Sequence, residues 1–226
     1  MATITVGTIK TRARQKADLV GSNFISDTEL LAYVNEAFFA WYDVLVSRFE
    51  DYNLGDPTSF TISAGTPYYD LPADFYKLAG VDRSIDNGNH YHALRPSPWR
   101  SRNRHTASYT SYGLYPRIGY RVTGNKLRFV PEDQSPGSYR LWYIPLATAL
   151  TQDSDTIERY NGFEELIVID TAMKMLAKEE SDLSYLNMER QRVENRMIQM
   201  MQQRSLEGSG CIEEVERADF DEDFFY

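Results

Sequence analysis

The hydrophobic and polar positions follow a helical period at both ends of the chain and an alternating period in the middle. Between residues 8 and 19 apolar side chains recur at every fourth position, namely Ile9, Ala13 and Ala17, with basic residues between them. This spacing places one apolar stripe on a short helix. The polar stretch Gly21-Ser22-Asn23 predicts that the helix ends before it.

The start of a second, longer helix is specified by a capping box. Ser26 precedes Glu29 by three residues, so the serine hydroxyl can accept from the Glu29 amide while the glutamate side chain reaches back to the Ser26 amide. Ile25 and Leu30 occupy the two positions of a hydrophobic staple around the box. Apolar residues continue at helical spacing as far as Phe49, which predicts a helix with a broad apolar face.

From residue 58 the period changes to two, which predicts β-strands. We expect five or six strands between residues 58 and 145. The clearest pair is a hairpin in which residues 120–122 and 126–130 alternate around the turn Thr123-Gly124-Asn125. Glycine favours such a turn because it adopts a positive φ without steric cost.

Two more helices are predicted after the strands. The first begins near Asn161 and reaches Glu180, with its apolar side formed by Leu166, Ile169, Met173, Leu176 and Ala177. Ser181-Asp182 caps the second, which reaches about Arg204 and carries a narrow stripe of leucine, valine and methionine. A methionine stripe of this kind favours core or helix packing over a ligand site, because methionine fills irregular gaps.

Helices at both ends and strands between them predict an α+β chain. We expect an α-helical bundle formed by the N- and C-terminal helices, over residues 1–56 and 149–207, with an inserted antiparallel β-domain over residues 57–148. A flexible acidic C-terminal tail, residues 208–226, completes this expected organisation.

Charge is segregated along the chain. Residues 87–131 contain no Asp or Glu, although the whole chain has a formal net charge of -9. Aromatic residues lie among the basic ones, which include Arg95, Arg100, Arg102, Arg104 and Arg117. Such a segment favours contact with a polyanion or an acidic partner, and the alternative is a β-domain whose acidic counterpart lies on helices of the same molecule.

The C-terminal tail carries most of the negative charge. It holds seven carboxylates against one arginine, Arg217, a net charge of -6. The tail is too short and polar for a core of its own, yet its apolar side chains exceed what a solubilising tail requires; these include Phe220, Phe224, Phe225 and Tyr226. We interpret it as a segment that folds on a partner, with disorder throughout as the alternative.

Patterns typical of catalysis or metal binding are weak. His90 and His92 would share one face of a strand, but no Asp or Glu follows them before Glu132, so surface or structural histidines are favoured over a metal site. The single cysteine, Cys211, excludes an internal disulfide framework. We therefore expect no enzyme activity, no cofactor and no metal. No stretch is typical of a signal peptide or a membrane span, so we expect a soluble protein.

Several segments occur in one order and spacing: Ser26-Asp27-Thr28-Glu29-Leu30-Leu31, Tyr33-Val34-Asn35-Glu36-Ala37, Phe60-Thr61-Ile62-Ser63-Ala64-Gly65 and Tyr69-Asp70-Leu71-Pro72-Ala73-Asp74-Phe75. Together with residues 166–182 they make the chain resemble the head-to-tail adaptor (connector) proteins of tailed bacteriophages, especially those of short-tailed phages. The resemblance covers roughly residues 5–205. Residues 87–131 and the acidic tail depart from the family pattern.

The resemblance implies a structural virion protein of the phage neck, assembled in the host cytoplasm. In such adaptors a helical bundle with an inserted β-domain forms a homo-oligomeric ring, commonly a dodecamer, beneath the portal protein. The ring extends the DNA channel, with transient contact to genomic DNA, and receives the next tail component, a nozzle or a tail tube. No cofactor, catalytic residue or membrane is implied.

These expectations assign three groups of residues. We expect Trp41, Met197 and Met200 to form apolar helix surface that neighbouring subunits cover. The tail arm that binds the portal contains Phe220, Phe224, Phe225 and Tyr226. The basic residues that face DNA or a partner are Arg95, Arg100, Arg102, Arg104 and Arg117. A nucleic-acid-binding module that uses residues 87–131 remains the alternative function, and a cell-wall hydrolase lacks a convincing pair of acids.

Overall fold

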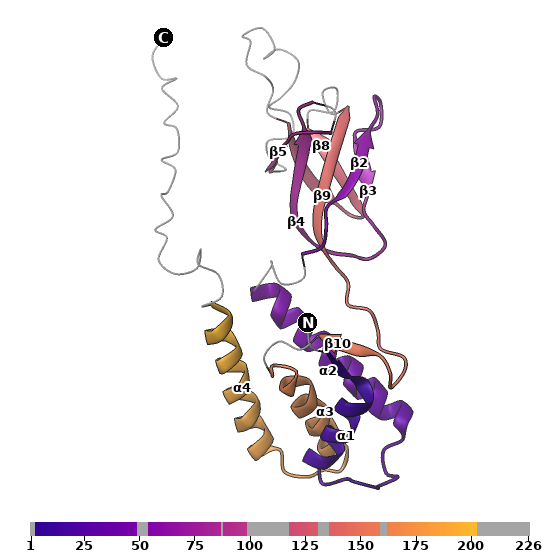
Figure 1. Cartoon of the computed structure of the whole chain (residues 1–226), viewed down its shortest axis with the longest axis vertical. Coiled ribbons are helices and arrows are strands. Elements are labelled where there is room, and N and C mark those ends of the chain that lie inside the picture. The colour runs from indigo at the N-terminus through magenta and orange to yellow at the C-terminus, as the bar shows by residue number, and fades with distance from the viewer. Residues whose placement is uncertain are drawn as a thin grey trace. The chain divides into compact units, whose positions relative to one another are not determined.

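The chain combines α-helices with antiparallel sheets, so the expected α+β class is confirmed. The computed structural model describes residues 3–48, 54–86, 88–98, 118–130, 136–158 and 162–202. It divides into two compact units, one formed by Met1–Trp41 with Ala149–Tyr226 and the other by Tyr42–Thr148 (Figure 1). The first unit is helical, and the second contains the two larger sheets.

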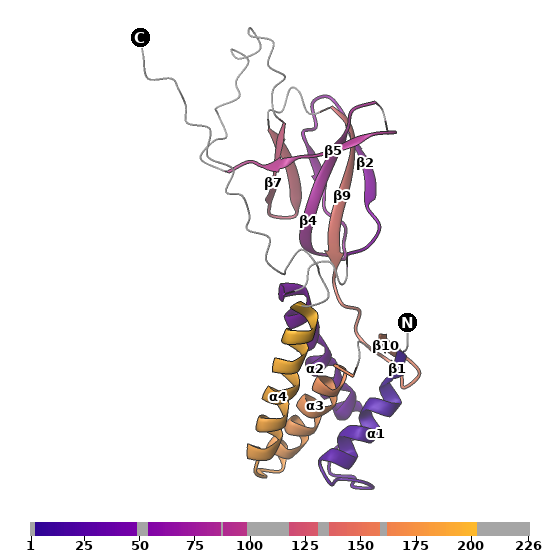
Figure 2. The same cartoon turned by 60° about the vertical axis from the view of Figure 1, so that its left-hand side comes forward.

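Four helices are described: α1 (Val6–Lys16), α2 (Asp27–Arg48), α3 (Glu165–Lys178) and α4 (Ser184–Gln202). Both views show α3 lying between α1 and α4 (Figures 1 and 2), and α3 packs against each of them. Among the described helices, none combines the length and the apolar character that a membrane crossing requires.

Helix α2 begins at the predicted capping box. The Glu29 amide donates to Ser26 Oγ at 3.3 Å. The staple residues Ile25 and Leu30 are both buried. The predicted start of this helix is therefore confirmed by the Ser26 cap and the buried staple.

The buried face of α3 differs from the predicted one. Met173 and Leu176 are only half-buried and Ala177 is exposed, whereas Ala172 and Met175 are fully buried. After Glu165 the helix has four consecutive apolar residues that are all buried, namely Leu166, Ile167, Val168 and Ile169. A continuous apolar run covers more than one side of a helix, so its period does not fix which side faces the core. The predicted cap, Asn161, lies outside the described residues.

The cap of α4 is confirmed, because Asp182 Oδ1 accepts from the Ser184 amide at 3.0 Å. Along the helix Leu186 and Met197 are buried. The predicted apolar stripe therefore packs only in part against the rest of the chain.

A two-stranded sheet that was not predicted joins the beginning of the chain to the segment before α3. Strand β1 (Thr3–Thr5) pairs in antiparallel register with β10 (Thr156–Glu158), and Ile4 opposes Ile157. Both isoleucines are buried. Three-residue strands are too short to show an alternating period, which explains why the sequence pattern did not reveal them.

The second unit contains two four-stranded sheets, shown as adjacent layers in Figures 1 and 2. The first sheet has the order β2-β9-β4-β5, with β2 (Thr58–Ile62), β9 (Gly137–Pro145), β4 (Phe75–Ser84) and β5 (Tyr91–Ala93). The second has the order β3-β8-β7-β6, with β3 (Tyr68–Asp70), β8 (Lys126–Val130), β7 (Gly119–Thr123) and β6 (Arg95–Pro96).

All neighbouring strands of these two sheets are antiparallel except β6 and β7, which are parallel. The described residues thus hold eight strands in this region, where five or six were expected. The difference comes in part from the two-residue strand β6, which is too short to show an alternating period.

One aromatic core fills the space between the two layers. Phe129 and Tyr139 are buried with ring centroids 4.4 Å apart, and Phe60 stacks on Tyr69 at 4.0 Å. These residues come from both sheets, β2 and β9 on one side and β3 and β8 on the other. Alternate residues along each strand therefore point into a shared core, as in a β-sandwich.

The predicted hairpin is confirmed as β7 and β8. Its closing pair is Thr123 with Lys126, and Gly124 in the turn has a φ of 60°. An L-amino acid with a side chain rarely adopts that φ, so glycine permits the tight connection.

The last turns of α2 belong to the second unit. There the Tyr42 hydroxyl donates to the Pro145 carbonyl oxygen at 2.6 Å, and the Tyr76 hydroxyl donates to Asp43 Oδ1 at 2.6 Å. Burial, with smaller contributions from Tyr76 and Asp43, raises the pKa of Tyr42. This tyrosine therefore remains a neutral hydrogen-bond donor.

Candidate interaction surfaces

The basic side chains of α1 find acidic partners within the helical unit. Lys10 Nζ lies 2.6 Å from Asp153 Oδ1, with only 11% of the lysine side chain exposed. Arg14 Nη2 lies 3.1 Å from Asp27 Oδ1, and its Nη1 donates to the Ser22 carbonyl oxygen at 3.0 Å. The two cations therefore connect α1 to the segment that contains Asp153 and to the start of α2.

Arg12 and Lys16 extend this pairing to α3 and α4. Arg12 forms an ion pair with Glu165, while Lys16 Nζ lies 3.0 Å from Glu165 and 2.8 Å from Glu189. Burial disfavours the charged lysine, but hydrogen bonds to Glu189 and Glu165 outweigh it, so the pKa of Lys16 is raised. The charge of α1 is thus balanced inside the chain, which argues against α1 as a nucleic-acid surface.

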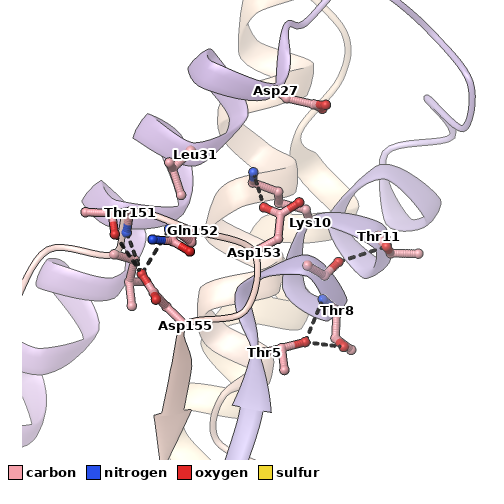
Figure 3. Close-up of polar contacts among 12 residues, drawn as sticks. Thr5, Thr8, Lys10, Thr11, Asp27, Leu31, Thr151, Gln152, Asp153 and Asp155 are labelled. Atoms are coloured by element: carbon pink, nitrogen blue, oxygen red, sulfur yellow. Dashed lines mark hydrogen bonds and ion pairs between the residues drawn. The ribbon is translucent and has the colours of Figure 1, made fainter.

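The loop before β10 is ordered by one carboxylate. Asp155 Oδ2 accepts from the backbone amides of Thr151 at 2.7 Å and Gln152 at 2.9 Å (Figure 3). These hydrogen bonds, the one from Thr151 first, lower the pKa of Asp155. The loop is therefore a preformed turn and not a flexible connection.

The same loop receives the start of α1. The amides of Val6 and Gly7 donate to the carbonyl oxygens of Asp155 and Asp153, at 2.9 and 3.0 Å. A Cβ added to Gly7 would lie 3.4 Å from that Asp153 oxygen, in van der Waals contact with the loop. Figure 3 shows Lys10 reaching the Asp153 side chain from the next turn of α1. Backbone and side-chain contacts together fix α1 on the loop.

Asn35 on α2 holds the chain where it returns to the helical unit. Its Oδ1 accepts from the Leu150 amide at 2.8 Å, and its Nδ2 donates to the Leu150 carbonyl oxygen at 2.9 Å. Leu150 itself is buried. One amide side chain therefore satisfies both backbone groups of a buried residue, as buried polar groups require.

Further ion pairs connect α3 to its neighbours. Their nitrogen-to-oxygen distances are 2.6 to 2.7 Å, and the pairs are Lys178 with Glu29, Lys174 with Glu36 and Arg190 with Asp170. The hydrogen bond from Arg190 to Asp170 is the main reason that the pKa of Arg190 is raised. Helix α3 is thus tied by charge to both α2 and α4.

Helix α4 leaves apolar side chains exposed. Tyr185 and Met188 lie one turn apart and are 70% and 67% exposed, and Met200 near the other end is 47% exposed. Tyrosine and methionine are enriched where proteins bind one another. In the described part of the chain, this helix offers the clearest apolar contact surface.

A second surface is cationic and lies on the outer face of the sheet β3-β8-β7-β6. Leu127 and Phe129 point into the core, so Lys126 and Arg128 on the same strand point outward. Arg121 on β7 lies directly opposite Arg128 in the antiparallel ladder. We call Tyr68, Arg121, Lys126 and Arg128 the cationic face.

Tyr68 organises the cationic face. Lys126 Nζ lies 3.8 Å from the centroid of its ring, and Arg128 Cζ lies 5.9 Å from it. One carboxylate, Asp70, approaches Lys126 at 3.4 Å and is itself 69% exposed. The face therefore combines a flat aromatic ring with three cations, of which Lys126 pairs with Asp70.

Comparison with known proteins decides the family. The family model described as SU10 adaptor protein matches residues 4–210. The chain belongs to the SU10 adaptor protein family. No curated protein matches it at a significant level. The resemblance to bacteriophage head-to-tail adaptors is thereby confirmed, and the adaptor is a structural phage protein.

The adaptor buries two of the three residues expected between subunits. Trp41 is 4% exposed and Met197 is fully buried, so their side chains are already covered by the same chain. Phe38 stacks on Trp41 with ring centroids 6.2 Å apart. Of this group, only Met200 presents apolar surface for another subunit in the described structure.

The other expected residues of the adaptor are mostly outside the described part. Arg95 is exposed on β6, whereas Arg100, Arg102, Arg104, Arg117, Phe220, Phe224, Phe225 and Tyr226 lie outside the described residues. His90 pairs with Asp86, and this hydrogen bond lowers the pKa of Asp86. Among the described residues, no three metal-binding side chains come together.

Sequence analysis missed Asn35, Asp153 and Asp155 as structural residues of the adaptor. Asn35 is a polar residue at the centre of an apolar helix, which signals a specific hydrogen bond. The run Thr151-Gln152-Asp153-Ser154-Asp155 has the composition of an Asx turn. No local pattern shows that Asn35 bonds to Leu150, or that Asp153 bonds to Lys10, because each pair is more than 100 residues apart in sequence.

Proposed function

We propose that this adaptor forms a homo-oligomeric ring, commonly a dodecamer in proteins of this kind, that joins the portal protein to the next tail component. The ring would extend the DNA channel in the neck of the virion. The observation that carries the proposal is the family match over residues 4–210, which includes both units of the chain.

The helical unit supplies the properties that a ring subunit needs. Its ion pairs connect all four helices, as with Lys16 between Glu165 and Glu189, and α4 presents Tyr185, Met188 and Met200. In a ring each apolar patch is covered by the next copy through a heterologous contact. We further propose that this unit is a helical bundle into which the β-domain is inserted.

The subunit contact can be tested with single charges on α4. Replacing Met188 with Glu places a carboxylate on the exposed apolar surface. Asn187→Glu adds the same charge at the preceding residue, which is also exposed. We expect native mass spectrometry to show loss of the ring for Met188→Glu and a normal ring for Asn187→Glu. Rings of equal abundance in both variants would exclude α4 from the subunit interface.

The acidic tail is the proposed arm for the portal. Its aromatic residues Phe220, Phe224, Phe225 and Tyr226 can bury apolar area only on another surface. Deletion of residues 208–226 should weaken binding to the portal while far-ultraviolet circular dichroism stays unchanged. Electron microscopy of the full chain incubated with its portal should show a ring on the portal, and the lack of any complex would overturn the proposal.

Contact with genomic DNA is the second candidate function. The cationic face favours it, since Lys126 and Arg128 lie two positions apart on the outer side of β8, where cations can approach phosphates. The chain's net charge of -9 opposes tight binding. Binding to a duplex at low salt, steeply weakened by added salt, would support it, and no binding at low salt would exclude it.

A further inference from the structure

One end of the helical unit exposes a cluster of large apolar side chains. The turn between α1 and α2 and the turn between α3 and α4 both lie at this end (Figures 1 and 2). Among the described residues, five large apolar side chains are more than half exposed, and four of them lie on these turns or on the first turns of α4. These four, which we call the apolar end, are Val20, Phe24, Tyr185 and Met188. Exposed apolar side chains that gather on one surface mark an interaction site.

Two contacts bring the two turns together. Lys178 Nζ at the end of α3 lies 5.0 Å from the centroid of the Phe24 ring. Lys16 Nζ at the end of α1 lies 2.8 Å from Glu189 Oε1, next to Met188 on α4. Segments more than 150 residues apart in the sequence therefore form the apolar end.

Carboxylates without cationic partners share these turns. Asp18, Glu179, Glu180 and Asp182 are all exposed, and within the described part of the chain none of them forms an ion pair. The cations at this end are already paired inside the chain, namely Arg14 with Asp27, Lys16 with Glu189 and Lys178 with Glu29. The apolar end therefore fits a partner that is both cationic and aromatic.

The chain contains a segment with this composition between β6 and β7. Residues 99–117 lie outside the described residues, and their sequence holds four arginines and no Asp or Glu. The arginines are Arg100, Arg102, Arg104 and Arg117, and the aromatic residues are Trp99, Tyr109, Tyr112 and Tyr115. Arginine, tryptophan and tyrosine are the residues that most often dominate the energy of protein interfaces.

Both ends of this connection are fixed at the edge of the second sheet. Arg95 on β6 pairs with Gly119 on β7, and the Ser97 amide donates to the Tyr120 carbonyl oxygen at 2.7 Å. A Cβ on Gly119 would lie only 2.9 Å from Ser97 Cβ, so glycine permits this close approach. A chain of about 20 residues that leaves one point and returns to it extends at most about 30 Å. The connection is therefore long enough to reach another copy of the chain.

We propose that residues 99–117 of one copy of this chain dock on the apolar end of a second copy. Their arginines pair with the carboxylates of the two turns, and their aromatic side chains cover Tyr185 and Met188, since methionine sulfur packs favourably on aromatic rings. The two surfaces differ, so the contact is heterologous and continues from copy to copy. The inference rests on the proposed ring and names what covers α4 there, but it does not require a portal.

Complementarity favours a second copy over DNA as the partner of residues 99–117. DNA would pair with the arginines, but it would leave the apolar end exposed and would approach a chain whose net charge is -9. Docking on a second copy brings the arginines to unpaired carboxylates and buries apolar area in the same contact.

Crosslinking of the full chain tests the contact. Cys211→Ser removes the single cysteine, and Ser108→Cys introduces one within the segment for attachment of a benzophenone. The labelled protein is irradiated at low salt and analysed by denaturing mass spectrometry, in which a contact between copies gives a covalent dimer. We expect such a dimer, with crosslinked peptides that contain residues 17–28 or 179–189.

Charge reversal supplies the matched variants. Arg102→Glu with Arg104→Glu should lower the dimer yield roughly tenfold, the effect of losing about 1.4 kcal/mol of charge pairing. Glu179→Arg with Glu180→Arg should do the same, and the chain that carries all four changes should regain the dimer. This rescue separates charge pairing from misfolding. Lys126→Glu with Arg128→Glu, an equal charge change on the cationic face, should leave the yield unchanged.

Four results would overturn the inference. Crosslinks that form only within one chain would place the segment on its own copy. Failure of the rescue would exclude pairing between these charges. Duplex DNA binding that depends on Arg102 and Arg104, without a covalent dimer, would assign the segment to DNA. A normal ring in native mass spectrometry without crosslinks to the expected peptides would reject this contact and leave the proposed ring standing, whereas crosslinked dimers without a ring would reject the ring instead.

Discussion

Lys178 near the end of α3 lies 2.7 Å from the Glu29 carboxylate in the first turn of α2. Glu29 also accepts from the Tyr33 hydroxyl at 2.8 Å, and its backbone amide donates to Ser26 Oγ. One carboxylate thus links a local signal in the sequence to a contact between helices that are more than 100 residues apart.

The capping box should contribute measurably to stability. Ser26→Ala removes the Oγ acceptor of the Glu29 amide, and loss of an N-cap side chain costs about 1 kcal/mol. We expect the free energy of unfolding, measured with urea, to fall by about that amount. Ser63→Ala, at an exposed turn residue, serves as the control and should change it by less than about 0.5 kcal/mol.

The contact with Lys178 should make stability depend on acid pH. The hydrogen bond from Lys178, followed by that from Tyr33, lowers the pKa of Glu29 below its ordinary 4.5. The stabilisation is therefore complete above pH 4.5 and is lost as the pH falls through the lowered value. Lys178→Met should raise the pKa of Glu29 in a carboxyl NMR titration and weaken this acid dependence.

Lys174→Met is the matched control for that titration. It removes a lysine pair from the same helix, the one with Glu36, but leaves the partners of Glu29 in place. The pKa of Glu29 should be the same as in the unchanged chain. An equal rise in both variants would mean that general loss of positive charge, and not the contact with Lys178, sets the pKa.

Local signals predicted the elements whose geometry is determined by nearby residues. The capping box at Ser26 fixed the start of α2, and Gly124 fixed the hairpin of β7 and β8. The buried side of α3 could not be derived, because Leu166 to Ile169 are apolar without interruption. The pairing of β1 with β10 joins residues more than 150 positions apart, and three residues show no period.

The interaction surfaces were predictable only in part. The basic character of residues 126–128 is visible in the sequence, but the opposition of Arg121 and Arg128 depends on the register of the hairpin. We predicted from the sequence that Trp41 and Met197 contact other subunits. The apolar character of a side chain does not reveal which surface covers it. Their burial within the chain follows from tertiary packing alone.

The side chain of Asn35 should contribute to the free energy of unfolding. Asn35→Ala leaves the amide and carbonyl groups of the buried residue Leu150 without their partner. Buried polar groups that lose a hydrogen bond cost about 1 to 3 kcal/mol, so urea unfolding should show a loss of about 2 kcal/mol. Asn187→Ala, an exposed change on α4, should be nearly neutral. Equal effects would show that the bond to Leu150 adds nothing specific.

The aromatic core should control the second unit separately from the helical unit. Phe129 is buried against Tyr139 and contacts Phe60 with centroids 6.2 Å apart. Phe129→Ala creates a cavity there and should cost about 4 kcal/mol, which hydrogen exchange would detect as lost amide protection in β4, β8 and β9. Because α3 belongs to the other unit, its amides should keep their protection. Val122→Ala, partly exposed on the same hairpin, is the control, and a parallel loss of protection in α3 would show that the two units unfold as one.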